Sequence, residues 1–481
     1  MINIKKQFEE LSTQMKATLA FMMCSFFQRG ISILTTPIFT RLLTANEYGF
    51  YSIFNSWLEI ISVFTTLKLA GSVFMQALVK YEDNKDQLTA STAGIGTTVT
   101  LLFLLLYIPL RKWINIILGM NTLVMLCIFI TSWATLMFEL WADQQRIQYK
   151  YRALIILTII TSIAKPIFGI FAILSTNQHK AEARILSLAL IELITYSWIF
   201  ISFLKKGHTF FNKKFWKYSL SLNLPLIPHY LTRVVLNQSD RLMINAMVGS
   251  SSAGIYSLAH NLAWMLTLIT NSILNTLNPW IFQQIKKKDF GCISELSYVI
   301  LRIVAIIGLG LISIAPEVVK VFAPTDYYNA IWVIPPLCAS VFFLFMYSLF
   351  ANFEYYYEKT KFLMIASTMG GILNIILNYF CIKEFGYIAA GYTTLLCYIF
   401  YAVTHYCCMK RILEDNLNGI KIYDIKVILK ISIAFVSTCV IFMLTYNIIL
   451  LRYSIIIISL IIIYIRRYNI INILRETKKK D

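Results

Sequence analysis

Residues 153–174 read ALIILTIITSIAKPIFGIFAIL, an almost wholly apolar stretch with a single charged side chain, Lys165. Hydrocarbon offers no partner for backbone N–H and C=O groups, so a chain crosses it as a helix of roughly 20 mostly apolar residues. Such stretches recur along the sequence, which is 58% hydrophobic and 14% charged, with a mean hydropathy of +0.67. This composition lies outside that of soluble globular proteins and predicts an all-α polytopic membrane protein.

Charged and turn-forming residues divide the apolar stretches into about 14 predicted transmembrane helices. No small-residue cleavage site follows the first stretch, so we expect it to remain in the mature protein. The predicted helices start near Ala17, Phe50, Leu88, Gly119, Ala153, Ile185, Tyr218, Ser252, Leu296, Ile331, Phe362, Tyr387, Val427 and Tyr453.

The formal net charge of +19 sets the expected orientation in the membrane. The Lys and Arg residues lie mainly in short gaps between apolar stretches, which argues against a nucleic-acid-binding face. One set of alternate gaps, with both termini and residues 205–217, holds roughly three times as many of them as the other set. Because cytoplasmic loops carry the excess of basic residues, we expect both termini to be cytoplasmic.

A short motif occurs twice, as Gly49-Phe50-Tyr51-Ser52 and as Gly254-Ile255-Tyr256-Ser257. Each copy opens the second helix of a predicted six-helix half. An internal repeat of this kind is typical of transporters that bind their cargo near the bilayer midplane. The repeat predicts two six-helix bundles, residues 1–210 and 211–415, followed by a helix pair and basic tail, residues 416–481.

Four elements resemble the polysaccharide exporters, or O-antigen flippases, of the multidrug/oligosaccharidyl-lipid/polysaccharide superfamily. They are PIFTRLL at 37–43 with EYGFY at 47–51, PLIP at 225–228, DRLMI at 240–244 with GIYSLA at 254–259, and NIILN at 374–378 with FGYIAAG at 385–391.

The resemblance implies two pseudo-symmetric bundles in a V around a central cavity, alternating access and a bacterial cytoplasmic (inner) membrane location. It implies a polyprenyl-diphosphate-linked oligosaccharide as cargo, with membrane lipids, a polysaccharide polymerase and chain-length proteins as partners. It also implies that the helix containing Pro225 and Pro228 bends during gating.

Three charged residues, Arg29, Lys165 and Arg233, fall near the centres of predicted helices, where a charge costs at least about 2.5 kcal/mol. Each shares a helix face with other polar residues at spacings of three and four. The resulting stripes suggest a shared water-filled cavity. We therefore expect the cargo to be bound by Arg29, Lys165, Arg233, Asn237, His260 and Asn271.

Arg29 and Arg233 occupy near-equivalent positions before the two repeated glycines. In a pseudo-twofold transporter they would face each other across the cavity and hold a diphosphate by charge-assisted hydrogen bonds. The alternative is that each forms a structural salt bridge, Arg29 with Glu59 and Arg233 with Asp240.

Carboxylates within predicted helices are candidates for binding a coupling ion, H⁺ or Na⁺. We name Glu59, Glu192 and Asp240, with internal ion pairs as the alternative. Pro166, Pro225 and Pro228 predict kinks that moving helices could use, although a kink can also be only structural.

No catalytic motif, metal-ligand spacing, cofactor motif or nucleotide-binding loop is found in the sequence, so we expect a secondary transporter and not an enzyme or an ATP-driven pump. A peptidoglycan lipid-precursor flippase and a multidrug cation exporter of the same superfamily remain alternatives. A membrane-embedded glycosyltransferase is a third, but the gap near residues 316–329 is short for its catalytic site.

Overall fold

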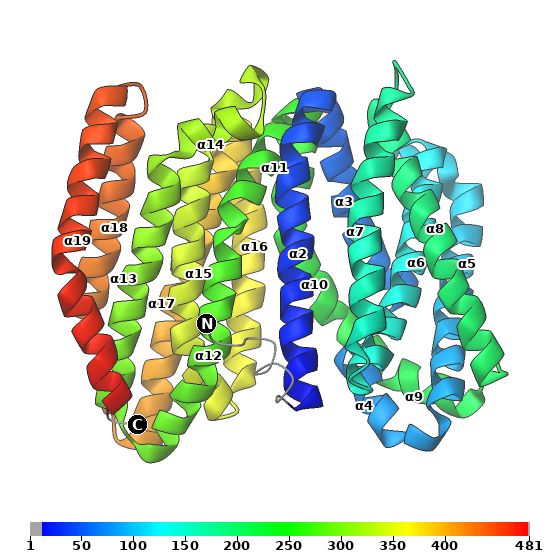
Figure 1. Ribbon diagram of the computed structural model, residues 1–481, viewed down its shortest axis with the longest axis horizontal. Coiled ribbons are helices and arrows are strands. Elements are labelled where there is room, and N and C mark those ends of the chain that lie inside the picture. Colours follow the sequence, from blue (N-terminus) through cyan, green and yellow to red (C-terminus); the bar gives the residue numbers. More distant parts are fainter. Residues whose placement is uncertain (1–11, 480–481) are drawn as a thin grey trace, which may run out of the picture. The chain divides into compact units, whose positions relative to one another are not determined.

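The computed structural model describes residues 12–479, which are helical apart from short connections and contain no strand. The chain forms two compact units, Met1–Gln238 and Ser239–Asp481 (Figure 1). The border between the units lies inside helix α10 (Ile227–Met247), so this helix supplies residues to both. The boundaries expected from the repeat, near residues 210 and 415, stay predictions.

The first unit consists of long helices that run alongside one another, with α8 in contact with α5, α6 and α7 (Figure 1). Two 3₁₀ turns, η1 (Glu82–Asn84) and η2 (Leu224–Leu226), join shorter pieces to them. Its helices before α10 are α2 (Thr13–Leu42), α3 (Ala45–Thr66), α4 (Ser72–Lys80), α5 (Lys85–Leu118), α6 (Thr122–Ile147), α7 (Tyr151–Leu174), α8 (Lys180–Gly207) and α9 (Lys213–Asn223).

The second unit is built around α15, which contacts α11, α12, α13, α16, α17 and α18. The apolar window of α15 is 83% buried, the highest share among the candidate membrane spans, so this helix forms the centre of the unit. The elements are α11 (Ser250–Trp264), α12 (Leu266–Lys287), α13 (Phe290–Ser313), α14 (Ala315–Phe322), η3 (Thr325–Trp332), α15 (Ile334–Tyr356), α16 (Thr360–Phe385), α17 (Ala389–Leu417), α18 (Ile425–Leu444) and α19 (Ile449–Lys479).

The predicted all-helical membrane fold is confirmed, and each of the expected helix starts lies in a helix or within one turn of its start. Within the part of the chain that the structure describes, 9 helices are long and apolar enough to cross a membrane by themselves. Polar residues lower the hydropathy of others, such as α10 and α17. The count of about 14 spans therefore stays a prediction.

Local sequence signals set the ends of several helices. Thr44 accepts a hydrogen bond from the backbone N–H of Glu47, whose carboxylate accepts one from the Thr44 N–H, and this capping box begins α3. Gly119 ends α5 with φ 65°, a left-handed conformation that glycine adopts at little cost. Asn121 then caps α6 by accepting from the N–H of Val124. These caps fix where consecutive helices turn back.

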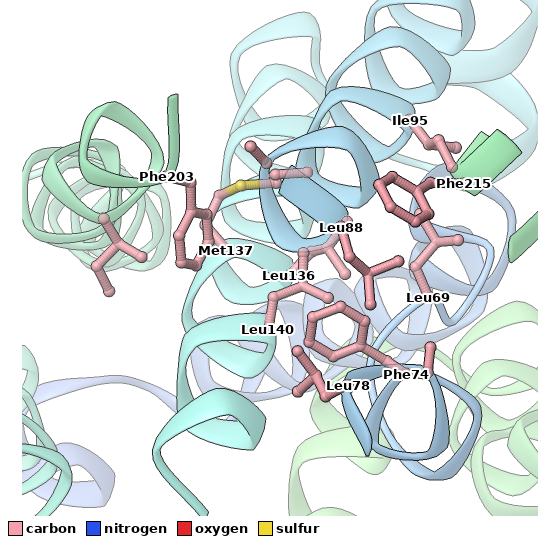
Figure 2. Close-up of a cluster of buried hydrophobic side chains, with 14 of the residues drawn as sticks. Leu69, Phe74, Leu78, Leu88, Ile95, Leu136, Met137, Leu140, Phe203 and Phe215 are labelled. Atoms are coloured by element: carbon pink, nitrogen blue, oxygen red, sulfur yellow. The ribbon is translucent and has the colours of Figure 1, made fainter. Parts of the chain in front are cut away.

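Buried apolar side chains of the first unit form a core between α4, α5, α6, α8 and α9 (Figure 2). From α6 this core receives Leu136, Met137 and Leu140. Lipid tails are as apolar as leucine, so packing of this kind is stabilised mainly by van der Waals contact. Where α5 and α8 approach closely, a Cβ at Gly207 would lie 2.5 Å from the Cβ of Ala90, which excludes a side chain there.

The two copies of the repeated motif have matching local structure. Gly49 lies in the second turn of α3 and Gly254 in the second turn of α11, and both glycines are buried. The following serines, Ser52 and Ser257, are buried as well. In each case the motif lies near the start of a helix, α3 or α11. That helix follows α2 or α10, the two helices that the sequence predicts to line the cavity.

Candidate functional site

A cavity of about 490 Å³ lies in the first unit and is lined by five charged side chains. Helix α6 supplies one continuous face to it, with residues spaced three and four apart, while Leu136, Met137 and Leu140 on another face pack into the core. The lining consists of Gln28, Lys68, Ala70, Gly71, Thr135, Phe138, Glu139, Ala142, Asp143, Arg146, Thr161, Ser162, Lys165 and Tyr196.

Lys165, predicted from its place in an apolar stretch, lines this cavity and forms an ion pair. Its Nζ lies 2.5 Å from Oε1 of Glu192 on α8. The hydroxyl of Thr135 lies 3.4 Å from the other carboxylate oxygen of Glu192, and the Tyr196 ring centroid lies 5.7 Å from the Lys165 Nζ. Glu192 is buried, so the pair neutralises a charge that lipid or protein could not solvate. Glu192 thus forms an internal ion pair in the structure, which the sequence analysis named as the alternative to binding a coupling ion.

A second ion pair lies at the end of α6. Oδ1 of Asp143 lies 2.8 Å from Nη1 of Arg146, and Oδ2 accepts a hydrogen bond of 2.7 Å from the backbone N–H of Gly71. Both carboxylate oxygens of Asp143 are therefore engaged. They tie the connection between α3 and α4 to the last turns of α6.

Arg29 and Arg233 are exposed, and among the described residues neither side chain makes a hydrogen bond or an ion pair. The salt bridges that were the alternative to a cargo role are not formed. Glu59 instead accepts a hydrogen bond of 2.7 Å from the Gln238 amide.

Asp240 belongs to a buried polar cluster in the second unit. Its Oδ1 accepts from the Asn378 amide at 2.6 Å, and its Oδ2 accepts from the hydroxyls of Tyr256 at 2.6 Å and Thr394 at 2.8 Å. Asn378 also donates to the side-chain oxygen of Asn374. This cluster fastens the end of α10 to α11, α16 and α17.

The other predicted cargo residues differ in their surroundings. Asn237 and Asn271 are exposed and have no hydrogen bond within the described residues, whereas His260 is held in place. Nη2 of Arg241 donates to Nδ1 of His260 at 2.9 Å, and the imidazole stacks on Trp264 with ring centroids 4.6 Å apart. Nδ1 is therefore an acceptor, which leaves Nε2 as the donor.

The three predicted kink prolines occupy two kinds of position. Pro225 lies in η2, and Pro228 in the first turn of α10, so the chain is interrupted between α9 and α10. Pro166 lies inside α7, which continues as one helix from Tyr151 to Leu174. The break that the sequence predicts before α10 is present.

Sequence reasoning did not name Glu139, Asp143 or Arg146 as site residues, and these lie in the last turns of α6. It also did not name Lys68 as a site residue, which lies just after α3. A signal was available: Thr135, Glu139, Asp143 and Arg146 fall on one helical face, but their tertiary neighbours decide what that face meets.

Residues 15–285, more than half of the chain, match the family described as polysaccharide biosynthesis protein. The chain belongs to this family. A Lsg locus protein of Haemophilus influenzae is 21% identical to this family member over 379 residues, which cover 75% of this chain and 89% of the Haemophilus protein. The resemblance to the polysaccharide exporters is confirmed.

Two groups of solved structures share the fold of this polysaccharide biosynthesis family member. The lipid II flippase MurJ in an inward closed conformation has a TM-score of 0.67 and 17% identity, covering 92% of this chain and 100% of that one. An inward-facing multidrug resistance MATE transporter of the MOP superfamily has a TM-score of 0.61 and 10% identity, covering 81% of this chain and 96% of that one. The chain is a multi-pass membrane protein with the fold of MOP superfamily transporters.

Proposed function

We propose that this protein is a flippase that moves a polyprenyl-diphosphate-linked oligosaccharide repeat unit, of the O-antigen or capsule type, across the bacterial cytoplasmic membrane. The family match over residues 15–285 carries the proposal, because this range includes every residue that lines the cavity of the first unit. The transporter fold supports alternating access as the mechanism. The implied partners are the lipid-linked cargo, membrane lipids, the polymerase and the chain-length proteins.

The free guanidinium groups support an anionic cargo. Arg29 and Arg233 each have a planar guanidinium fork that fits two phosphate oxygens. Lys165 would add a weaker attraction, because Glu192 already neutralises its charge. Asn237, Asn271 and His260 offer hydrogen bonds suited to sugar hydroxyls.

Coupling to an H⁺ or Na⁺ gradient belongs to the same proposal, with Glu59, Glu192 and Asp240 as candidate residues. Each of these carboxylates already accepts hydrogen bonds or forms an ion pair. A coupling cation would have to displace those donors, so binding there would accompany a local rearrangement. The proposed orientation places both termini in the cytoplasm.

Deletion of the gene tests this function when it is combined with complementation. We expect one surface polysaccharide to disappear, its lipid-linked repeat unit to accumulate, and the wild-type gene to restore export. Arg29→Ala or Arg233→Ala should restore little export at normal protein abundance, because neither arginine has an ion-pair partner among the residues that the structure describes. Lys at either position should restore part of it.

A normal surface polysaccharide in the deletion strain would contradict the proposed function. Full export by the Arg29→Ala, Arg233→Ala double variant would leave the function standing and remove the two arginines from cargo binding.

A peptidoglycan-precursor flippase is the second candidate, and the fold shared with the lipid II flippase MurJ favours it. Both candidates would bind a polyprenyl diphosphate, so the choice depends on the sugar. If deletion of the gene abolished viability and a known lipid II flippase restored it, this second candidate would be correct. A cation exporter fits less well with two arginines that have no ion-pair partner in the described part of the chain.

A further inference from the structure

Glu139 is the carboxylate of the first-unit cavity that has no hydrogen-bond or ion-pair partner among the residues that the structure describes. It lies on α6 about two turns before the end of the helix. Its side chain is exposed to the cavity. In contrast, Glu192 and Asp143 have their cationic partners in place. A free carboxylate within a membrane span calls for a functional explanation.

The charges around the cavity balance only if Glu139 is ionised. Two pairs cancel, Lys165 with Glu192 and Arg146 with Asp143. This leaves Lys68, just after α3, and Glu139, which both line the cavity and form no salt bridge with each other. A proton on Glu139 would therefore give the cavity a net positive charge.

The neighbours of Glu139 favour a proton over a metal cation. Helices α4 and α5 contribute no titratable side chain to the lining, and α2 contributes Gln28. Among the side chains that the structure describes, no group of three His, Cys, Asp or Glu residues could hold a metal. The titratable groups nearest to Glu139 are Lys68 after α3, Asp143 and Arg146 on α6, Lys165 on α7, and Tyr196 with the lysine-bound Glu192 on α8.

We propose that Glu139 is a proton-binding residue that links protonation to the entry of an anionic diphosphate into this cavity. The inference rests on the proposed function. A proton from solution binds a carboxylate oxygen of Glu139, the cavity becomes net positive, and the diphosphate then enters the cavity beside Lys68. When the anion leaves, the carboxylate ionises again and the proton returns to solution.

The proposed linkage predicts the direction in which the affinity for the anion changes with pH. Above the pKa of Glu139 in the free protein, binding of the anion must take up a proton, so affinity falls as pH rises, by up to about tenfold for each pH unit. Gln keeps the shape of the side chain but carries no charge. Glu139→Gln should therefore bind the anion tightly at every pH, and Glu139→Asp should retain the pH dependence.

Titration calorimetry of the purified full chain with geranylgeranyl diphosphate tests the proposal. The second pKa of a phosphate group is about 6, so measurements near pH 8 avoid most titration of the ligand. Buffers of different ionisation enthalpy give the number of protons taken up. We expect about one proton more for wild type than for Glu139→Gln. The exposed residue Glu414, in a surface pair with Lys410, supplies the control Glu414→Gln, which should match wild type.

Equal proton uptake by wild type and Glu139→Gln, with both binding the ligand, would overturn the role of Glu139 and leave the proposed function intact. Loss of binding in Glu139→Gln, with the variant still monodisperse, would also overturn it, because a neutral side chain should favour the anion. Failure of the wild type to bind any polyprenyl diphosphate would overturn the proposed cargo together with this inference.

Discussion

Lys165 and Glu192 illustrate how a charged residue is kept within an apolar helix. The lysine lies in the middle of α7 and the glutamate is buried on α8, so neither would be stable there alone. Their 2.5 Å contact and the nearby Thr135 hydroxyl compensate for lost hydration. The pair also holds α7 against α8 at the wall of the cavity.

Removing one member of this pair should destabilise the protein more than removing both. Lys165→Ala leaves the Glu192 carboxylate buried without its partner, which costs about 3 kcal/mol. The double variant Lys165→Ala, Glu192→Gln should recover most of the thermal stability in detergent, measured as Tm. If the two single effects add in the double variant, the pair does not stabilise the fold.

The sequence predicted some residues of the candidate site and missed others. Lys165 and Glu192 could be found because a charge inside an apolar stretch needs an explanation. Glu139 and Lys68 could not, because their role depends on how the connection after α3 lies against α6. Hydropathy contains no information on that contact.

Helices were predicted most accurately where the membrane restricts the conformations that the chain can adopt. A spanning segment must satisfy its own backbone hydrogen bonds, so apolar length alone located α5, α6, α7 and α8. The proline pair also predicted the interruption before α10. The separation of α4 from α3, and of α14 and η3 from α15, was not predicted, since these short pieces are set by packing.

Helix α8 offers a test of orientation, because exposed residues lie at both of its ends. Gln178 precedes α8 and Lys206 lies in its last turn, and both are exposed. In a variant lacking the nine native cysteines, a membrane-impermeant thiol reagent should label Gln178→Cys in intact cells. Lys206→Cys should react only after permeabilisation. The reverse pattern would place the termini outside the cytoplasm.

Across the whole molecule, a family match and a transporter fold occur together with a charged cavity in the first unit. Composition and hydropathy predicted the class of protein, and the motifs predicted its family. The sugar cannot be predicted in this way, because hydrogen bonds to hydroxyl groups can come from many polar side chains. The central claim is therefore that the chain moves a polyprenyl-diphosphate oligosaccharide between leaflets.

Vesicles that contain the purified full chain and a fluorescent polyprenyl-diphosphate oligosaccharide test the proposed movement. A membrane-impermeant quencher reports how fast the label passes between leaflets. We expect flipping to be fast with wild type, faster under an imposed proton or sodium gradient, and near the protein-free rate with the Arg29→Ala, Arg233→Ala variant. Flipping by wild type at the protein-free rate, with or without a gradient, would contradict the account.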